Sequence, residues 1–182
     1  MSVSSQVHSY LKDIEILYQK RLIPQGQKTL KKARSLCLKH ELFGLSIVLL
    51  NWERRLNQLS DSQTRLESEI YEEQHNLMLQ QGEVTELQSL FNQLIEYKQV
   101  YGYERGEESE KLAAIIDSPL LDSPDPLLSV RARYYYYIIA SNYYYMVGKF
   151  EAGYKASTAQ VQLDLSPQED LEYLNGTLEH TS

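Results

Sequence analysis

The stretch RARYYYYIIASNYYYMVGKFEAGYKASTAQVQLDLSP, from Arg131 to Pro167, decides the fold of this chain. Its first half is a run of tyrosines and aliphatic residues, its second half is dotted with alanine, and Gly148-Lys149 lies between the two. A glycine directly after a helix-forming run is typical of a helix C-terminus, and a proline cannot continue the helix before it. The stretch therefore predicts one helical hairpin: a tyrosine-rich helix, a tight turn and a second helix that ends before Pro167.

The tyrosine-rich helix carries seven rings, at residues 134–137 and 143–145, within about three helical turns. At about 100° per residue, these rings cannot all lie on one face. A helix with aromatic residues all round must be packed on most of its sides, with each hydroxyl reaching water or a polar partner. Some of the rings could instead line an open groove.

The rest of the chain repeats the helical pattern, with apolar residues at three- and four-residue steps and no segment that alternates like a strand. The expected helices run from Ser4 or Ser5 to about Leu22, from about Pro24 to His40, from about Leu42 to Leu59, over about 62–100, over about 107–116, and from Pro126 into the tyrosine run. The sequence thus predicts a single all-α domain. Its segments are expected to be 1–59, 60–101, a short helix and proline-rich loop at 102–126, and the hairpin with the start of a further helix at 127–182.

The segment 62–100 carries a degenerate heptad pattern. Its apolar residues Ile70, Leu77, Val84, Leu87, Phe91 and Leu94 follow alternating three- and four-residue steps, while Glu73 and Gln80 interrupt them. The pattern fits either the seam of a coiled-coil homodimer or one long helix packed within the chain. Because an interior glycine costs roughly 1 kcal/mol, Gly82 could also divide the segment into two helices.

Charge and composition narrow the class of protein. The net charge of −7 argues against general nucleic-acid binding. Residues 1–60 hold 10 Lys/Arg and 4 Asp/Glu (+6), whereas residues 61–182 hold 8 and 21 (−13). Five basic side chains line one side of the expected helix at 24–40: Lys28, Lys31, Lys32, Arg34 and Lys39. They could contact an acidic partner or be ordinary solvated surface.

The single cysteine, Cys37, excludes an intrachain disulfide framework and is expected to be a buried apolar residue. The N-terminus lacks the pattern of a signal peptide, and the longest apolar run, Leu45–Leu50, is far too short to span a bilayer. We therefore expect a cytoplasmic protein without membrane contact.

The hairpin resembles the tetratricopeptide repeat. Large, small, turn and aromatic residues follow the order of that repeat. The positions are Tyr137, Ala140-Ser141, Tyr144, Gly148, Phe150 and Ala152-Gly153. Residues 11–39 are a weaker match, with Arg21-Leu22 where a glycine would stand. Most of the chain also resembles the tetratricopeptide-like proteins of unknown function of Bacteroidetes-type bacteria. The resemblance implies hairpins stacked as a right-handed solenoid with one long central helix.

If this register holds, the family geometry implies a concave, partner-binding face formed by Tyr135, Ile138, Asn142 and Tyr145. Some family members bind a peptide carboxylate on that face, for which Arg131 and Asn142 are the candidates in this chain. The implied function is a non-enzymatic scaffold that binds a protein or peptide.

No catalytic, cofactor-binding or metal-binding motif is evident. Glu72 and His75 match half of a di-iron helix signature that needs a second copy, and the chain has none. Phosphate-loop, dinucleotide, zinc-protease and nucleophile-elbow patterns are missing from the sequence. We therefore expect no enzyme, cofactor or metal. Two further hypotheses are a homo-oligomeric structural protein, joined through the long helix or a solenoid end, and a regulatory module that senses a ligand or peptide.

Overall fold

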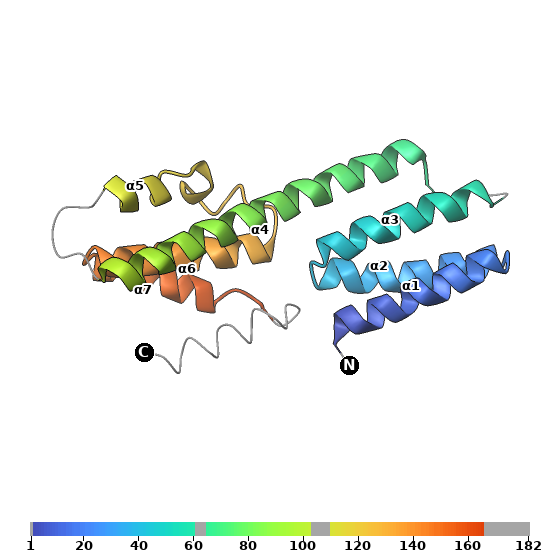
Figure 1. Ribbon diagram of the computed structural model, residues 1–182, viewed down its shortest axis with the longest axis horizontal. Coiled ribbons are helices and arrows are strands. Elements are labelled where there is room, and N and C mark those ends of the chain that lie inside the picture. Colours follow the sequence, from blue (N-terminus) through green and yellow to red (C-terminus); the bar gives the residue numbers. More distant parts are fainter. Residues whose placement is uncertain (1, 61–64, 103–109, 166–182) are drawn as a thin grey trace. The chain divides into compact units, whose positions relative to one another are not determined.

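The computed structural model describes residues 2–60, 65–102 and 110–165, and within these ranges the chain is all-α. They contain seven α-helices and one 3-10 turn, with no strand (Figure 1). The elements are α1 (Val3–Gln19), α2 (Ile23–Lys39), α3 (Phe43–Gln58), α4 (Glu67–Tyr101), α5 (Glu110–Ile116), η1 (Pro119–Leu121), α6 (Val130–Met146) and α7 (Phe150–Val161). The chain forms two compact units, residues 1–81 and 82–182, which are described separately.

Three hairpins connect α1 to α2, α2 to α3, and α6 to α7 through one common turn. The second residue after each helix adopts positive φ, at Arg21 (58°), Glu41 (49°) and Gly148 (75°). The next amide then bonds back across the helix end, as in Lys149 N to Tyr144 O at 2.8 Å, which satisfies a carbonyl that the helix leaves free. Because the turn has constant length, α1, α2 and α3 begin at residues 3, 23 and 43, and α6 and α7 begin at 130 and 150.

Two of these turns have a residue other than glycine at the position of positive φ. Only Gly148 is the expected glycine, and Arg21 and Glu41 hold the same left-handed conformation with a side chain attached. This conformation costs a non-glycine residue roughly 1–2 kcal/mol. The packing of the flanking helices therefore imposes the turn at these two positions.

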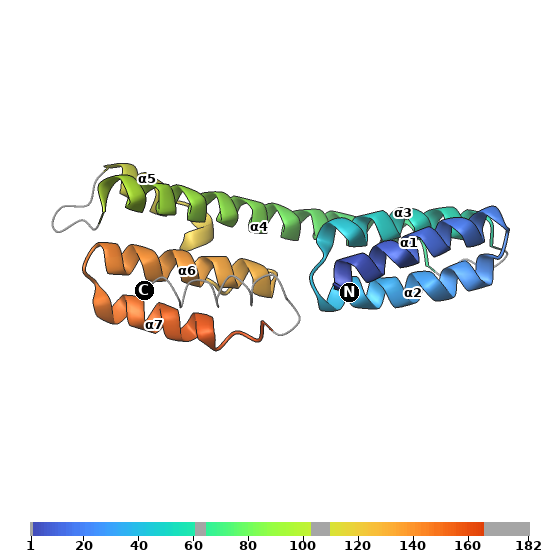
Figure 2. The same ribbon diagram turned by 60° about the horizontal axis from the view of Figure 1, so that its bottom comes forward.

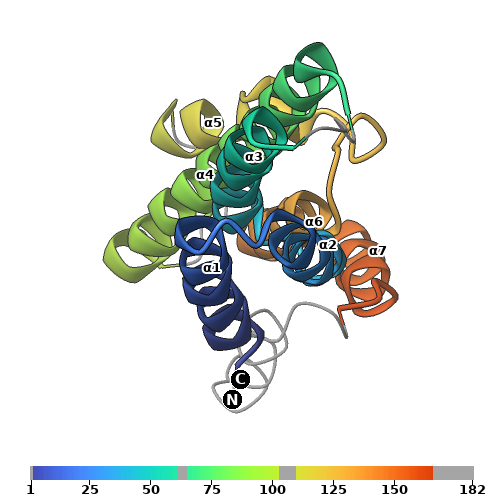
Figure 3. The ribbon, with the colours of Figure 1, turned by 90° about the vertical axis from the view of Figure 1, so that its right-hand side faces the viewer.

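The first unit is built on a core shared by α1, α2 and α3. Figures 2 and 3 show the three helices grouped around a common centre. Each helix contributes fully buried side chains, including Ile14 from α1, Ala33 and Cys37 from α2, and Leu49 and Leu56 from α3. The expected burial of Cys37 is confirmed.

The long segment forms one helix, α4, of 35 residues. Gly82 does not break it, because the buried apolar seam outweighs the cost of one interior glycine. The seam residues Ile70, Leu77, Val84, Leu87 and Leu94 are each at most 5% exposed. These five seam residues are therefore buried within the single chain and not available to a coiled-coil partner, while other apolar side chains of α4, such as Met78 and Leu79, are exposed.

Two predicted helix starts were wrong. The hydroxyl of Ser2, rather than that of Ser4 or Ser5, caps α1 by accepting from the Ser5 amide at 3.2 Å. Helix α6 begins at Val130 instead of Pro126, because the Ser129 hydroxyl accepts from the Ala132 amide at 3.0 Å. A capping hydroxyl stabilises the helix start where it can reach the free amides. The predicted cap at 61–62 and the predicted further helix near the C-terminus lie outside the described residues.

Candidate functional site

Three of the predicted partner-binding residues, Arg131, Tyr135 and Ile138, are buried in α6, with exposed fractions of 9%, 6% and 4%. The Tyr135 hydroxyl accepts a hydrogen bond from the Gln88 amide of α4 at 3.0 Å, and its ring lies 6.1 Å from that of Phe91. Tyr134 packs edge-on against Tyr135, with the ring centroids 5.4 Å apart. In this conformation these side chains join α6 to the second half of α4, and the expectation of a helix packed on most sides agrees with their burial.

The other two predicted residues, Asn142 and Tyr145, are half-buried. The Asn142 amide donates to the Ile138 carbonyl of its own helix at 2.8 Å. Tyr145 lies at the start of the hairpin turn, where its ring packs 6.3 Å from the ring of Phe150 and against the backbone of Gly153. The five predicted residues thus form no single open surface, and only Tyr145 borders an exposed apolar one.

That exposed surface runs along α7. Phe150, Tyr154 and Val161 are 67%, 68% and 77% exposed. With 100° per residue, they fall within roughly 40° of one another around the helix, while the buried Gly153 and Ala156 face α6. We call these three residues the α7 stripe. The stripe was not predicted from the sequence, although its spacing of four and seven residues is visible there.

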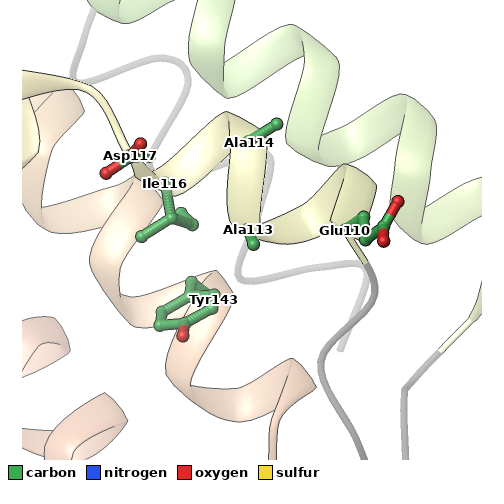
Figure 4. A pocket seen from close by; sticks show the side chains of 6 residues that line it. All are labelled: Glu110, Ala113, Ala114, Ile116, Asp117 and Tyr143. Atoms are coloured by element: carbon green, nitrogen blue, oxygen red, sulfur yellow. The ribbon is translucent and has the colours of Figure 1, made fainter.

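A shallow depression of about 520 Å³ lies between α5 and α6 (Figure 4). Ala113 and Ala114 leave it open, the Tyr143 ring faces it from α6, and the carboxylates of Glu110 and Asp117 lie at opposite ends of α5. Glu110 and Asp117 are seven residues apart, which places their backbones about 10 Å apart along the helix. We assign no catalytic pair to the depression.

The first unit contains a partly buried network of alternating charges. Glu53 of α3 is 4% exposed and accepts from Arg34 of α2, while Arg65 lies 3.5 Å away. Arg34 also donates to both carboxylate oxygens of Glu73 in α4 at 2.7 Å, and Arg65 donates to Glu73 at 2.6 Å. Burial lowers the pKa of Arg65, but its hydrogen bond to Glu73 and the nearby carboxylates outweigh this effect and raise the pKa overall. Two cations thus neutralise two anions, which makes the network a link between helices.

The remaining chemistry of the described residues is sparse. They contain no group of three His, Cys, Asp or Glu arranged to hold a metal ion, and Glu72 and His75 are exposed. Burial raises the pKa of the Cys37 thiol, and a hydrogen bond with Ser46 lowers it by less, which leaves a pKa of about 11. The thiol therefore stays protonated and unreactive at neutral pH. Among the helices of the described ranges, none combines the length and apolarity needed to cross a bilayer.

Comparison of the chain with protein-family models, with curated proteins and with solved structures found no match. The described part of the chain is all-helical, and its consecutive helices pack as antiparallel hairpins.

Proposed function

We propose that this chain is a non-enzymatic helical scaffold that binds a protein or peptide partner, and that the partner docks on the α7 stripe. The observation that carries the proposal is the exposure of Phe150, Tyr154 and Val161 along one line of a helix. Exposed apolar residues are common singly, but three that align on one side of a helix give the kind of apolar surface that is typical of an interaction site. Tyr145 at the edge of the stripe would extend it onto α6.

The size of the stripe favours one occupant, the apolar face of a single amphipathic helix. Two aromatic side chains and a valine at this exposure offer on the order of 400 Å². A stable homodimer usually buries about 800 Å² on each copy. A partner helix instead uses a few apolar anchors three, four or seven residues apart, and the stripe residues are themselves four and seven residues apart. The homo-oligomer is therefore our second candidate.

In this proposal the hairpins stack in the manner of a tetratricopeptide-like solenoid. The constant turn and the regular helix starts support such stacking, because each hairpin would present the same faces to the next. The length of the repeat differs from that of the family. Two successive helices with their turns span 40 residues, from the start of α1 at Val3 to the start of α3 at Phe43, against about 34 in the tetratricopeptide repeat. We attribute the difference to helices of 16–17 residues.

The test is a selection of helical peptides against the full chain from a displayed library of amphipathic sequences. The selected peptides are measured again on the variant Phe150→Ser/Tyr154→Ser/Val161→Ser and on the control Leu38→Ser/Val100→Ser, which changes exposed apolar residues elsewhere. We expect loss of binding in the first variant alone. Peptides that bind both variants equally would place the surface elsewhere.

Two further measurements separate the other occupants of the stripe. Sedimentation of the wild type over a concentration series detects a homodimer, and its disappearance in the stripe variant would support the homo-oligomer instead. Hydroxyl-radical footprinting of Phe150 and Tyr154 in the free chain measures whether residues after 165 cover them. Strong protection in the monomer would refute a surface open to a partner.

A further inference from the structure

A second surface, independent of the α7 stripe, lies on α2 in the first unit. We propose that the outward face of α2, formed by Lys28, Lys31, Lys32 and Lys39, is a docking site for an acidic segment of another protein. We call these four residues the lysine stripe.

The lysine stripe is opposite the buried face of its helix. At 100° per residue, the four lysines fall within an arc of roughly 100°, and the buried side chains of Leu30, Ala33 and Cys37 lie on the other side of the helix. All four lysines are exposed. Since α2 packs against both α1 and α3 on its inner side, the stripe runs along the outer surface of this three-helix unit.

The charges of the stripe are uncompensated within the described part of the chain. Helix α2 contains no acidic residue, and no described carboxylate forms an ion pair with any of the four lysines. Arg34 shows the contrast, because it belongs to the same helix and is fully engaged by Glu53 and Glu73. Like charges at three- and four-residue spacing repel each other and destabilise a helix. A partner with carboxylates would remove that repulsion.

The composition of the stripe favours an acidic protein segment over a nucleic acid. The stripe has lysines but no arginine, the residue that recognises phosphate in a bidentate manner, and no aromatic ring among the four on which a base could stack. The eleven helical steps from Lys28 to Lys39 correspond to about 16 Å, which fits an acidic helix of three turns.

The charge of the whole chain favours a short partner. The whole chain carries a net charge of −7, so its negative residues would repel an extended polyanion or an anionic membrane. Salt screens the interaction between charges more than about 8–10 Å apart. A segment of three turns can therefore be attracted by the four lysines without being repelled by carboxylates farther away.

The test is the binding of the full chain to a labelled helical peptide that carries glutamates at the spacing of the lysines. Binding is measured by fluorescence anisotropy at low and at physiological salt. The stripe variant Lys28→Gln/Lys31→Gln/Lys32→Gln/Lys39→Gln is compared with the control Lys12→Gln/Lys20→Gln/Lys149→Gln/Lys155→Gln, which changes the net charge equally. Since exposed ion pairs are individually weak, we expect about tenfold weaker binding for the stripe variant, little change for the control, and weaker binding at higher salt.

Three results would overturn the proposal. The first is equal affinity for the peptide and for its glutamine analogue. The second is equal loss in the stripe and control variants, which would indicate a general effect of charge. The third is tighter binding of duplex DNA or of phosphatidylserine vesicles, lost only in the stripe variant, which would assign the stripe to another class of ligand. Circular dichroism confirms that each variant keeps its helices.

Discussion

Removing the charge of Glu53 should destabilise the first unit more than any exposed charge change can. The substitution Glu53→Gln keeps the size of a side chain that is 4% exposed but leaves Arg34 and Arg65 with Glu73 as their only remaining partner in the network. Breaking a fully buried ion pair costs about 3–5 kcal/mol. The two arginine side chains are 20% and 28% exposed, so water recovers part of that energy, and we expect a loss of about 2–3 kcal/mol.

The chain supplies its own local probe for this measurement. Trp52 is the single tryptophan of the sequence, it belongs to the first unit, and its ring lies 5.7 Å from that of Tyr18. Urea unfolding followed by tryptophan fluorescence therefore reports the first unit, even if the second unit unfolds separately. With a slope of roughly 1–3 kcal/mol per molar urea, the transition midpoint should fall by about 1 M or more.

The matched control is Glu72→Gln, which removes one carboxylate from the exposed side of α4. Its midpoint should hardly move, because exposed charges contribute little. The double variant Arg34→Gln/Glu53→Gln should lose less than the sum of the two single changes, since the two side chains bond each other. If Glu53→Gln moves the midpoint no more than Glu72→Gln does, the network does not stabilise the unit and this reasoning is refuted.

Three further predictions concern the turns, the contact of α7 with α6, and a buried tyrosine of α6. Arg21→Gly should raise the free energy of unfolding by about 1 kcal/mol in urea titrations, and Gly148→Ala should lower it by a similar amount, because both positions require positive φ; the opposite signs would contradict the turn geometry. Gly153→Ala should lower the melting temperature despite the better helix propensity of alanine, because the new Cβ would lie 3.0 Å from the Tyr145 ring; a higher temperature would show that the ring moves aside freely. Burial raises the pKa of Tyr134 to about 12, so the stability that it contributes is complete below pH 10 and is lost as the pH rises toward 12. Tyr134→Phe should therefore match the wild type at pH 9 and exceed it by about 1 kcal/mol at pH 11 in urea unfolding; an equal loss in both proteins would rule out this residue as the cause.

Local sequence information was sufficient for the helices and for one turn. The three- and four-residue spacing of apolar side chains predicted every described helix to within a few residues, and Gly148 marked the turn of the last hairpin. Helix formation and glycine preference depend on neighbours along the chain, so the sequence carries them directly. The breaks near Arg21 and Glu41 were predicted, but the positive φ of these two residues was not, because packing imposes it there against local preference.

The predicted partner face could not be separated from the core by the same reasoning. Tyr135 and Phe150 are both aromatic residues on amphipathic helices, yet one is 6% exposed and the other 67%. The difference depends on whether another helix packs over each residue. Helix α4 covers Tyr135 through Phe91, which lies 44 residues earlier in the sequence, but it does not cover Phe150.

The sequence by itself therefore determined the helical class of this protein and the hairpin around Gly148, whereas it left open whether the segment 62–100 is one helix or two. Only the tertiary structure decided which aromatic residues are core, which lysines remain unpaired and which distant charges meet, as Arg34 and Glu73 do. The physical reason is that helix propensity acts over a few residues, whereas burial and ion pairing depend on segments that meet in space after folding.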